Sequence, residues 1–153
     1  MDPLTGLGGR DDFLAWLRKT GVSVCGIYLD IDAFNGVSAV FGHVEGDRVL
    51  TELGGWLSRK ARSLGLDAFR IGGDDFVLIG TAMTGDQARA LAAGIVRDSQ
   101  TLGLPYGHPL KTRTQFSLSA AVFRASSADR GEFKAALDQL GNGGGNASHS
   151  MGH

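Results

Sequence analysis

The sequence has too few cysteines for a disulfide framework and no apolar stretch of membrane-spanning length. Its single cysteine, Cys25, cannot form an intramolecular disulfide, and its place in an apolar segment indicates a core residue rather than a nucleophile. No apolar run reaches the roughly 20 residues that a transmembrane helix needs, and no basic-then-apolar leader opens the chain. We therefore expect a cytoplasmic domain without a membrane segment.

The chain also lacks an excess of charge of either sign. Acidic and basic residues nearly balance over 153 residues, leaving a net charge of −1, and no basic stripe is interleaved with aromatic residues. The whole molecule therefore creates no field that would draw it to nucleic acid or to an anionic membrane. Hydrophobic residues make up 42% of the chain and charged residues 20%, which is typical of a globular domain with a proper core.

Glycine, by contrast, is abundant, with 24 residues, several of them near the carboxyl end. Residues 1–141 are predicted to form one domain. Residues 142–153 are predicted to be a flexible Gly-rich tail, because they offer too little apolar surface to offset the entropy of ordering. The first motif begins almost at the first residue, so we expect the chain to be a domain cut from a longer protein.

Hydrophobic periodicity predicts alternating helices and strands. Helices are expected at 11–19, 33–41 and 44–64, from 84 onward and after 126; strands are expected at 22–30, 68–71, 76–81 and 112–124. The nearly continuous apolar run at 22–30 is typical of a central strand buried on both faces. The order of elements predicts an α/β sandwich.

Two pairs of carboxylates follow apolar strands. Asp30 and Asp32 end the first strand, while Asp74 and Asp75 follow two glycines at the tip of a predicted hairpin. Alternation along a strand would place Asp74 and Asp75 on opposite faces. If the first strand lies beside the hairpin, Asp30 and Asp74 can share Mg²⁺, which takes one or two carboxylates together with substrate phosphates. This pattern favours nucleotidyl transfer, whereas either pair alone would indicate a solvated acidic turn.

Four motifs occur in a fixed order along the chain. They are Asp-Pro-Leu-Thr-Gly-Leu at 2–7, Asp-Ile-Asp-Ala-Phe at 30–34 with Gly-His at 42–43 and Gly-Asp at 46–47, Arg-Ile-Gly-Gly-Asp-Asp-Phe at 70–76, and Ser-Leu-Ser-Ala-Ala-Val at 117–122. Together they resemble the GGDEF domain of diguanylate cyclases, in a divergent GGDDF variant with Asp75 in place of the usual Glu. The resemblance implies the ferredoxin-like palm of nucleotidyl cyclases, with a mostly antiparallel central sheet flanked by helices.

The resemblance also implies a reaction and its residues. Two GTP molecules, held by two domains of a homodimer, would condense into cyclic di-GMP or a related cyclic dinucleotide. Asp30, Asp74 and the backbone carbonyl of Ile31 would bind Mg²⁺ (or Mn²⁺), and Asp75 takes the position of a base or second-metal ligand. Asp30, Asp74 and Asp75 are thus the expected catalytic residues. The residues expected to contact the nucleotide are Phe34, Asn35, Ser38, Asp47, Gly72 and Gly73.

Several positions depart from the family's pattern. Asn35 replaces a lysine that contacts phosphate, and Ser38 replaces an asparagine that reads the guanine edge. Asp75 is one methylene shorter than glutamate, and the basic pair of the family's last helix is missing. The product-inhibition motif would fall on residues 63–66, where it is absent. Two functions stay open: a cyclase, and a catalytically degenerate domain that binds GTP or dimerises as a regulatory module, in either case beside a sensory domain of a longer protein.

Overall fold

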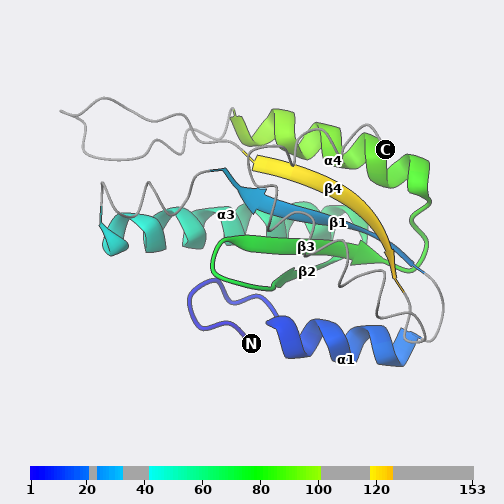
Figure 1. Cartoon of the computed structure of the whole chain (residues 1–153), viewed down its shortest axis with the longest axis horizontal. Helices are drawn as coiled ribbons and strands as arrows, with labels where there is room; N and C mark the ends of the chain where they lie inside the picture. Colours follow the sequence, from blue (N-terminus) through cyan, green and yellow to red (C-terminus); the bar gives the residue numbers. More distant parts are fainter. Residues whose placement is uncertain (21–23, 33–41, 101–117, 126–153) are drawn as a thin grey trace.

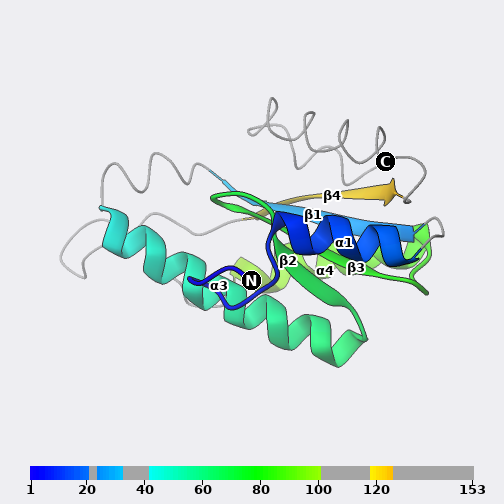
Figure 2. The same cartoon turned by 90° about the horizontal axis from the view of Figure 1, so that it is seen from below.

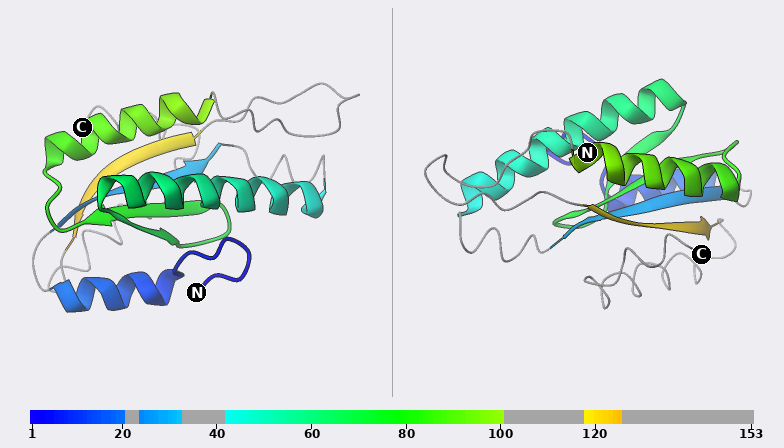
Figure 3. Two further views of the ribbon diagram at one scale, coloured as in Figure 1. Left: turned by 180° about the vertical axis from the view of Figure 1, so that it is seen from behind. Right: turned by 90° about the horizontal axis from the view of Figure 1, so that it is seen from above.

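Three helices and four strands make up the part of the chain that the computed structural model describes, namely residues 1–20, 24–32, 42–100 and 118–125. In chain order they are α1 (Arg10–Thr20), β1 (Val24–Ile31), α3 (His43–Leu64), β2 (Asp67–Arg70), β3 (Asp75–Gly80), α4 (Gly85–Gln100) and β4 (Leu118–Ala125). The helices α3 and α4 cover one face of the sheet, and α1 lies against the other (Figure 1; Figure 3).

The four strands form one sheet in the order β2-β3-β1-β4, and each neighbouring pair is antiparallel. The strand β1 is therefore central, as its continuous apolar run predicts. It pairs with β3 as far as Asp30, which lies opposite Asp75, and with β4 as far as Ile31, which lies opposite Leu118. This architecture confirms the predicted α/β fold with an antiparallel sheet flanked by helices.

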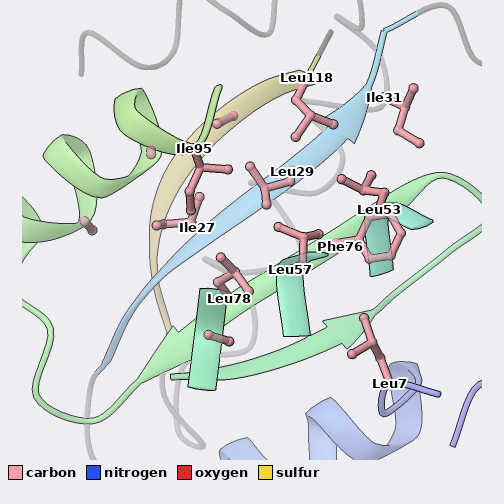
Figure 4. Packing of buried hydrophobic residues seen from close by; sticks show 14 of the residues in the cluster. Leu7, Ile27, Leu29, Ile31, Leu53, Leu57, Phe76, Leu78, Ile95 and Leu118 are labelled. Carbon is pink, nitrogen blue, oxygen red and sulfur yellow. The ribbon is translucent and has the colours of Figure 1, made fainter. Parts of the chain in front are cut away.

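Alternate residues of β1 divide the hydrophobic core into two clusters. Ile27, Leu29 and Ile31 pack with residues of α3 and α4 (Figure 4). Val24 and Tyr28 belong to the second cluster, together with residues of α1. Burying one large apolar side chain stabilises a fold by about 1.5–3 kcal/mol, so apolar contacts on both faces hold the sheet in place.

The helices over the larger cluster have well-defined ends. At the start of α4, the backbone N–H of Gln87 donates to Thr84 Oγ1 (3.2 Å), and the backbone N–H of Thr84 donates to Gln87 Oε1 (2.9 Å). This is a capping box, and it makes Thr84 the N-cap. At the end of α3, Gly65 adopts a left-handed conformation with φ 71°, and the backbone N–H of Leu66 donates to the carbonyl of Ala61.

The predicted elements agree with the structure where it describes the chain. The helices expected at 11–19 and 44–64 and both hairpin strands are confirmed, and Cys25 is buried. The last predicted strand is confirmed from residue 118 onward. The predicted helices at 33–41 and after 126, and the tail at 142–153, lie outside the described residues. Among the described helices, none is long and apolar enough to cross a membrane.

Candidate active site

The end of β1 meets the tip of the β2–β3 hairpin at one end of the sheet (Figure 1). The backbone N–H of Ile31 donates to the carbonyl of Asp74 (3.2 Å), and the N–H of Ile71 donates to the carbonyl of Asp75 (3.0 Å). Since Asp30 lies opposite Asp75 in the sheet, these contacts bring three predicted catalytic residues together. Gly72 and Gly73 form the exposed turn beside them.

Asp30 and Asp74 form a pair of interacting carboxyl groups. Burial, followed by the nearby charges of Asp74, Asp75 and Asp32, raises the pKa of Asp30 to about 7. Burial and the charge of Asp75 also raise the pKa of Asp74 above its usual value. A protonated Asp30 can therefore donate a hydrogen bond to Asp74, so that the folded chain holds these two groups with less than their full charge.

A divalent cation fits the chemistry of this pair. Within the described part of the chain, no three His, Cys, Asp or Glu side chains are arranged to hold a metal ion by themselves. Two carboxylates with the backbone carbonyl of Ile31 would leave positions for water and phosphate oxygens, which is the mixed coordination that Mg²⁺ prefers. The crowding that raises the pKa of Asp30 and Asp74 would be relieved by a bound cation.

Asp75 has a different partner from its neighbour. The hydroxyl of Tyr28 donates a hydrogen bond to Asp75 Oδ2, and burial, then this bond, raises the pKa of Tyr28. The prediction that Asp74 and Asp75 point to opposite faces stays a prediction: Asp75 lies opposite Asp30 and contacts Tyr28, whereas the backbone of Asp74 lies opposite Ile31. Asp74 precedes β3 and lies in the turn, where strand alternation does not apply.

Residues 1–9, which precede α1, contact the β2–β3 hairpin on the side away from β1. Arg70 Nη1 donates to Asp2 Oδ1 (2.9 Å), and Arg70 Nη2 donates to the carbonyl of Gly73 (2.7 Å). Thr5 donates to Asp2 Oδ2 through both its backbone N–H and its hydroxyl. Although burial alone would raise the pKa of Asp2, these hydrogen bonds and the charge of Arg70 lower it. The opening motif thus supports the turn that carries the acid groups.

Of the other residues predicted to contact the nucleotide, the structure describes Asp47 but not Phe34, Asn35 or Ser38. Asp47 is exposed in the first turns of α3, and its carbonyl accepts a hydrogen bond from the Thr51 hydroxyl. Phe34, Asn35 and Ser38 lie outside the described residues.

Sequence reasoning missed the polar supports of the site. Tyr28 reads as one more apolar strand residue, and its place two residues before Asp30 was the available signal for a contact near the acid groups. Asp2 and Arg70 stand in two separate motifs, and only their opposite charges hinted at a pair. On β4, Ser119 donates a hydrogen bond to Asp32.

Known proteins resemble this chain in sequence and in fold. The family model described as "Diguanylate cyclase, GGDEF domain" matches residues 1–147. Diguanylate cyclase DgcS of Shewanella oneidensis is 43% identical over 86 residues, which are 51% of this chain and 28% of that protein. Diguanylate cyclase DgcZ of Escherichia coli is 36% identical over 132 residues, which are 82% of this chain and 43% of that protein.

A solved structure shows the same fold. The GGDEF domain of DgcB from Caulobacter crescentus, in complex with c-di-GMP, superposes with a TM-score of 0.77 at 22% identity, covering 94% of this chain and 88% of that one. At this identity the likeness concerns the fold. The chain spans between 20% and 32% of the length of DgcS and two other curated relatives.

Proposed function

Because the chain belongs to the GGDEF-domain family of diguanylate cyclases, we propose that it condenses two GTP molecules into cyclic di-GMP. The meeting of Asp30 and Asp74 at the end of β1 and the hairpin tip carries this proposal. The pKa values of Asp30 and Asp74 are raised because both carboxyl groups are partly buried and lie close to other negative charges. A divalent cation that also binds a triphosphate would neutralise this negative charge.

Each GTP supplies both a nucleophile and a leaving group. The 3′-hydroxyl of one GTP forms a bond to the α-phosphorus of the other, and the bond to pyrophosphate breaks. The same exchange in the opposite sense closes the ring, so two GTP give one cyclic di-GMP and two pyrophosphates, and each hydroxyl proton passes to a base. Such transfers depend mainly on positioning and charge neutralisation by the protein.

The residues of the site divide this work. Asp30, Asp74 and the backbone carbonyl of Ile31 would hold Mg²⁺ or Mn²⁺. When bound, the cation neutralises triphosphate charge and makes the attacking hydroxyl more acidic. Asp75 accepts the proton of that hydroxyl, and the exposed turn at Gly72 and Gly73 lets phosphate approach the backbone.

Further residues and a second chain complete the proposed machinery. Asp47 hydrogen-bonds guanine, and Phe34, Asn35 and Ser38 are assigned to nucleotide binding from the family motifs alone. A homodimer is required, because each chain holds one GTP and the reaction consumes two. A cytoplasmic location and a sensory or regulatory domain as partner are part of the same proposal.

Mass spectrometry of the products tests the proposal. The concentrated chain is incubated with GTP, or with ATP to test base selectivity, in the presence of Mg²⁺ or Mn²⁺. We expect cyclic di-GMP from the wild-type chain and on the order of 100-fold less from Asp30→Ala and Asp74→Ala, because each loses a carboxylate of the site. Asp86→Ala is the matched control, since this carboxylate is exposed at the start of α4.

An absence of product from the wild-type chain, even at high concentration or after fusion to a dimerising domain, would contradict the proposal. Undiminished product from the Asp74→Ala variant would count against the assigned site.

A second candidate is a regulatory module that binds GTP or dimerises without turnover. Asn35, which carries no charge toward phosphate, and the short side chain of Asp75 favour it. Calorimetry with a non-hydrolysable GTP analogue and Mg²⁺ separates the two functions. Binding without product supports a module that binds GTP. An absence of binding contradicts both the cyclase and the GTP-binding module, and leaves dimerisation as the remaining role.

A further inference from the structure

Tyr28 is a buried polar residue next to the proposed active site. Its hydroxyl donates a hydrogen bond to Asp75 Oδ2, while only 4% of the residue is exposed. We infer that Tyr28 is a positioning residue, which fixes the Asp75 carboxylate for the proposed cyclase reaction. The inference rests on the proposed function, because it gives Asp75 a task that depends on its exact orientation.

The register of the sheet explains why Tyr28 reaches Asp75. Tyr28 and Asp30 lie two residues apart on β1 and so share a face. On β3, Asp75 lies opposite Asp30, and Val77 lies opposite Tyr28. Tyr28 and Asp75 are therefore diagonal neighbours on the face that packs against α1, a separation that a long aromatic side chain spans.

The second oxygen of Asp75 is confined by the turn. Asp75 Oδ1 is buried, and no described residue shares a hydrogen bond with it. A Cβ atom at Gly72 would collide with this oxygen, so the carboxylate rests against the bare backbone of the turn. With Oδ1 packed in this way, the hydroxyl of Tyr28 is the contact that selects the orientation of the carboxylate.

Loss of the hydroxyl would release Asp75 from this orientation. Without the hydroxyl, no described donor would reach either oxygen of this half-buried carboxylate, and an unsatisfied acceptor in such a place is costly. The side chain would turn toward solvent and away from the position in which it accepts a proton. A displacement of about 1 Å in a catalytic group costs on the order of 100-fold in rate.

Kinetics of Tyr28→Phe test the assignment. We expect kcat to fall about 10- to 100-fold, while KM for GTP stays within about twofold, because the hydroxyl orients a reacting group and does not bind the nucleotide. Trp16→Phe is the matched control: it also trims a polar aromatic side chain and removes a hydrogen bond to a carboxylate, that of Asp67 at the start of β2 (2.8 Å). An unchanged kcat in Tyr28→Phe, or an equal fall in Trp16→Phe, overturns the inference.

A double-variant cycle tests the contact without using activity. The midpoint of urea unfolding is measured for Tyr28→Phe, Asp75→Ala and the combined variant. If Tyr28 acts on Asp75, the combined shift is clearly smaller than the sum of the two single shifts, because both single variants break the same bond. Additive shifts overturn the inference, whether or not the chain turns over.

The two readouts separate failure of the inference from failure of the proposed function. Non-additive shifts in a chain that makes no product support the positioning of Asp75 by Tyr28, and the failure then belongs to the proposed function. Non-additive shifts together with a fully active Tyr28→Phe variant overturn the inference, because the contact would then be structural only.

Discussion

The two adjacent glycines at the hairpin tip have different surroundings. A Cβ at Gly72 would collide with the Asp75 carboxylate, whereas a Cβ at Gly73 would meet nothing within 4 Å. Neither residue is among the described glycines with a positive φ, so the difference comes from packing and not from backbone conformation. At the residue scale, the absent side chain of Gly72 thus decides where the acid group of Asp75 can rest.

Gly72→Ala is expected to lower the free energy of unfolding by about 1–3 kcal/mol, because overpacking forces the Asp75 carboxylate or the turn to move. Gly73→Ala is its matched control and should change the free energy of unfolding by less than about 0.5 kcal/mol. Urea unfolding of the metal-free chain measures both. Equal effects of the two substitutions would show that the carboxylate does not rest on Gly72.

At the scale of elements, the segment before α1 connects the hairpin to the helix α3. It passes beside β2 and along α3 (Figure 2). Arg70 and Asp2 form an ion pair whose side chains are 15% and 16% exposed, and the backbone N–H of Arg70 donates to the carbonyl of Gly8 (2.8 Å). The hairpin is therefore held from two sides, by β1 and by this segment.

Asp2→Asn should weaken the contact between the hairpin and the segment before α1, because it removes the ion pair with Arg70. We expect the free energy of unfolding to fall by about 1–2 kcal/mol, because Arg70 loses a charged acceptor in a largely buried place. Hydrogen exchange should become faster at residues 2–8 and 70–75 and stay unchanged in α4. Asp98→Asn breaks the more exposed pair with Lys60 and should change the free energy of unfolding clearly less than Asp2→Asn does, because water screens an exposed pair. Faster exchange throughout the chain would instead indicate general destabilisation.

Over the whole molecule, charge nearly balances, yet three carboxyl groups gather at one end of the sheet. The pKa of Asp30 is about 7 in the folded chain, against an ordinary value of 3.8. Between these values the folded chain keeps a proton that the unfolded chain has lost. The contribution of the protonated Asp30 carboxyl to the free energy of unfolding is therefore fully present below pH 3.8, and it is lost as the pH rises through 7.

The stability of metal-free wild-type chain should accordingly fall between pH 4 and pH 8 relative to that of Asp30→Asn, by about 1–2 kcal/mol after allowance for solvent screening. Added Mg²⁺ should stabilise the wild-type chain at pH 8 and leave Asp30→Asn unchanged, since the cation binds the ionised pair. Thermal unfolding across this pH range, with and without Mg²⁺, measures both effects. Parallel pH profiles of the two chains would refute the raised pKa of Asp30.

By itself, the sequence determined the elements and the main carboxylate pair. Apolar periodicity located α1, α3 and the hairpin strands, because burying an apolar face decides whether a helix or a strand forms. The apolar run before Asp30 indicated a central strand, and the acid groups at the ends of two strands indicated that they would meet. The family motifs then supplied the antiparallel sheet.

Only the tertiary structure decided which polar groups support the site. The bond between Tyr28 and Asp75 joins residues 47 positions apart, and the bond between Arg70 and Asp2 joins residues 68 positions apart. Such contacts depend on the register of β1 against β3 and on the course of the segment before α1, neither of which local periodicity encodes.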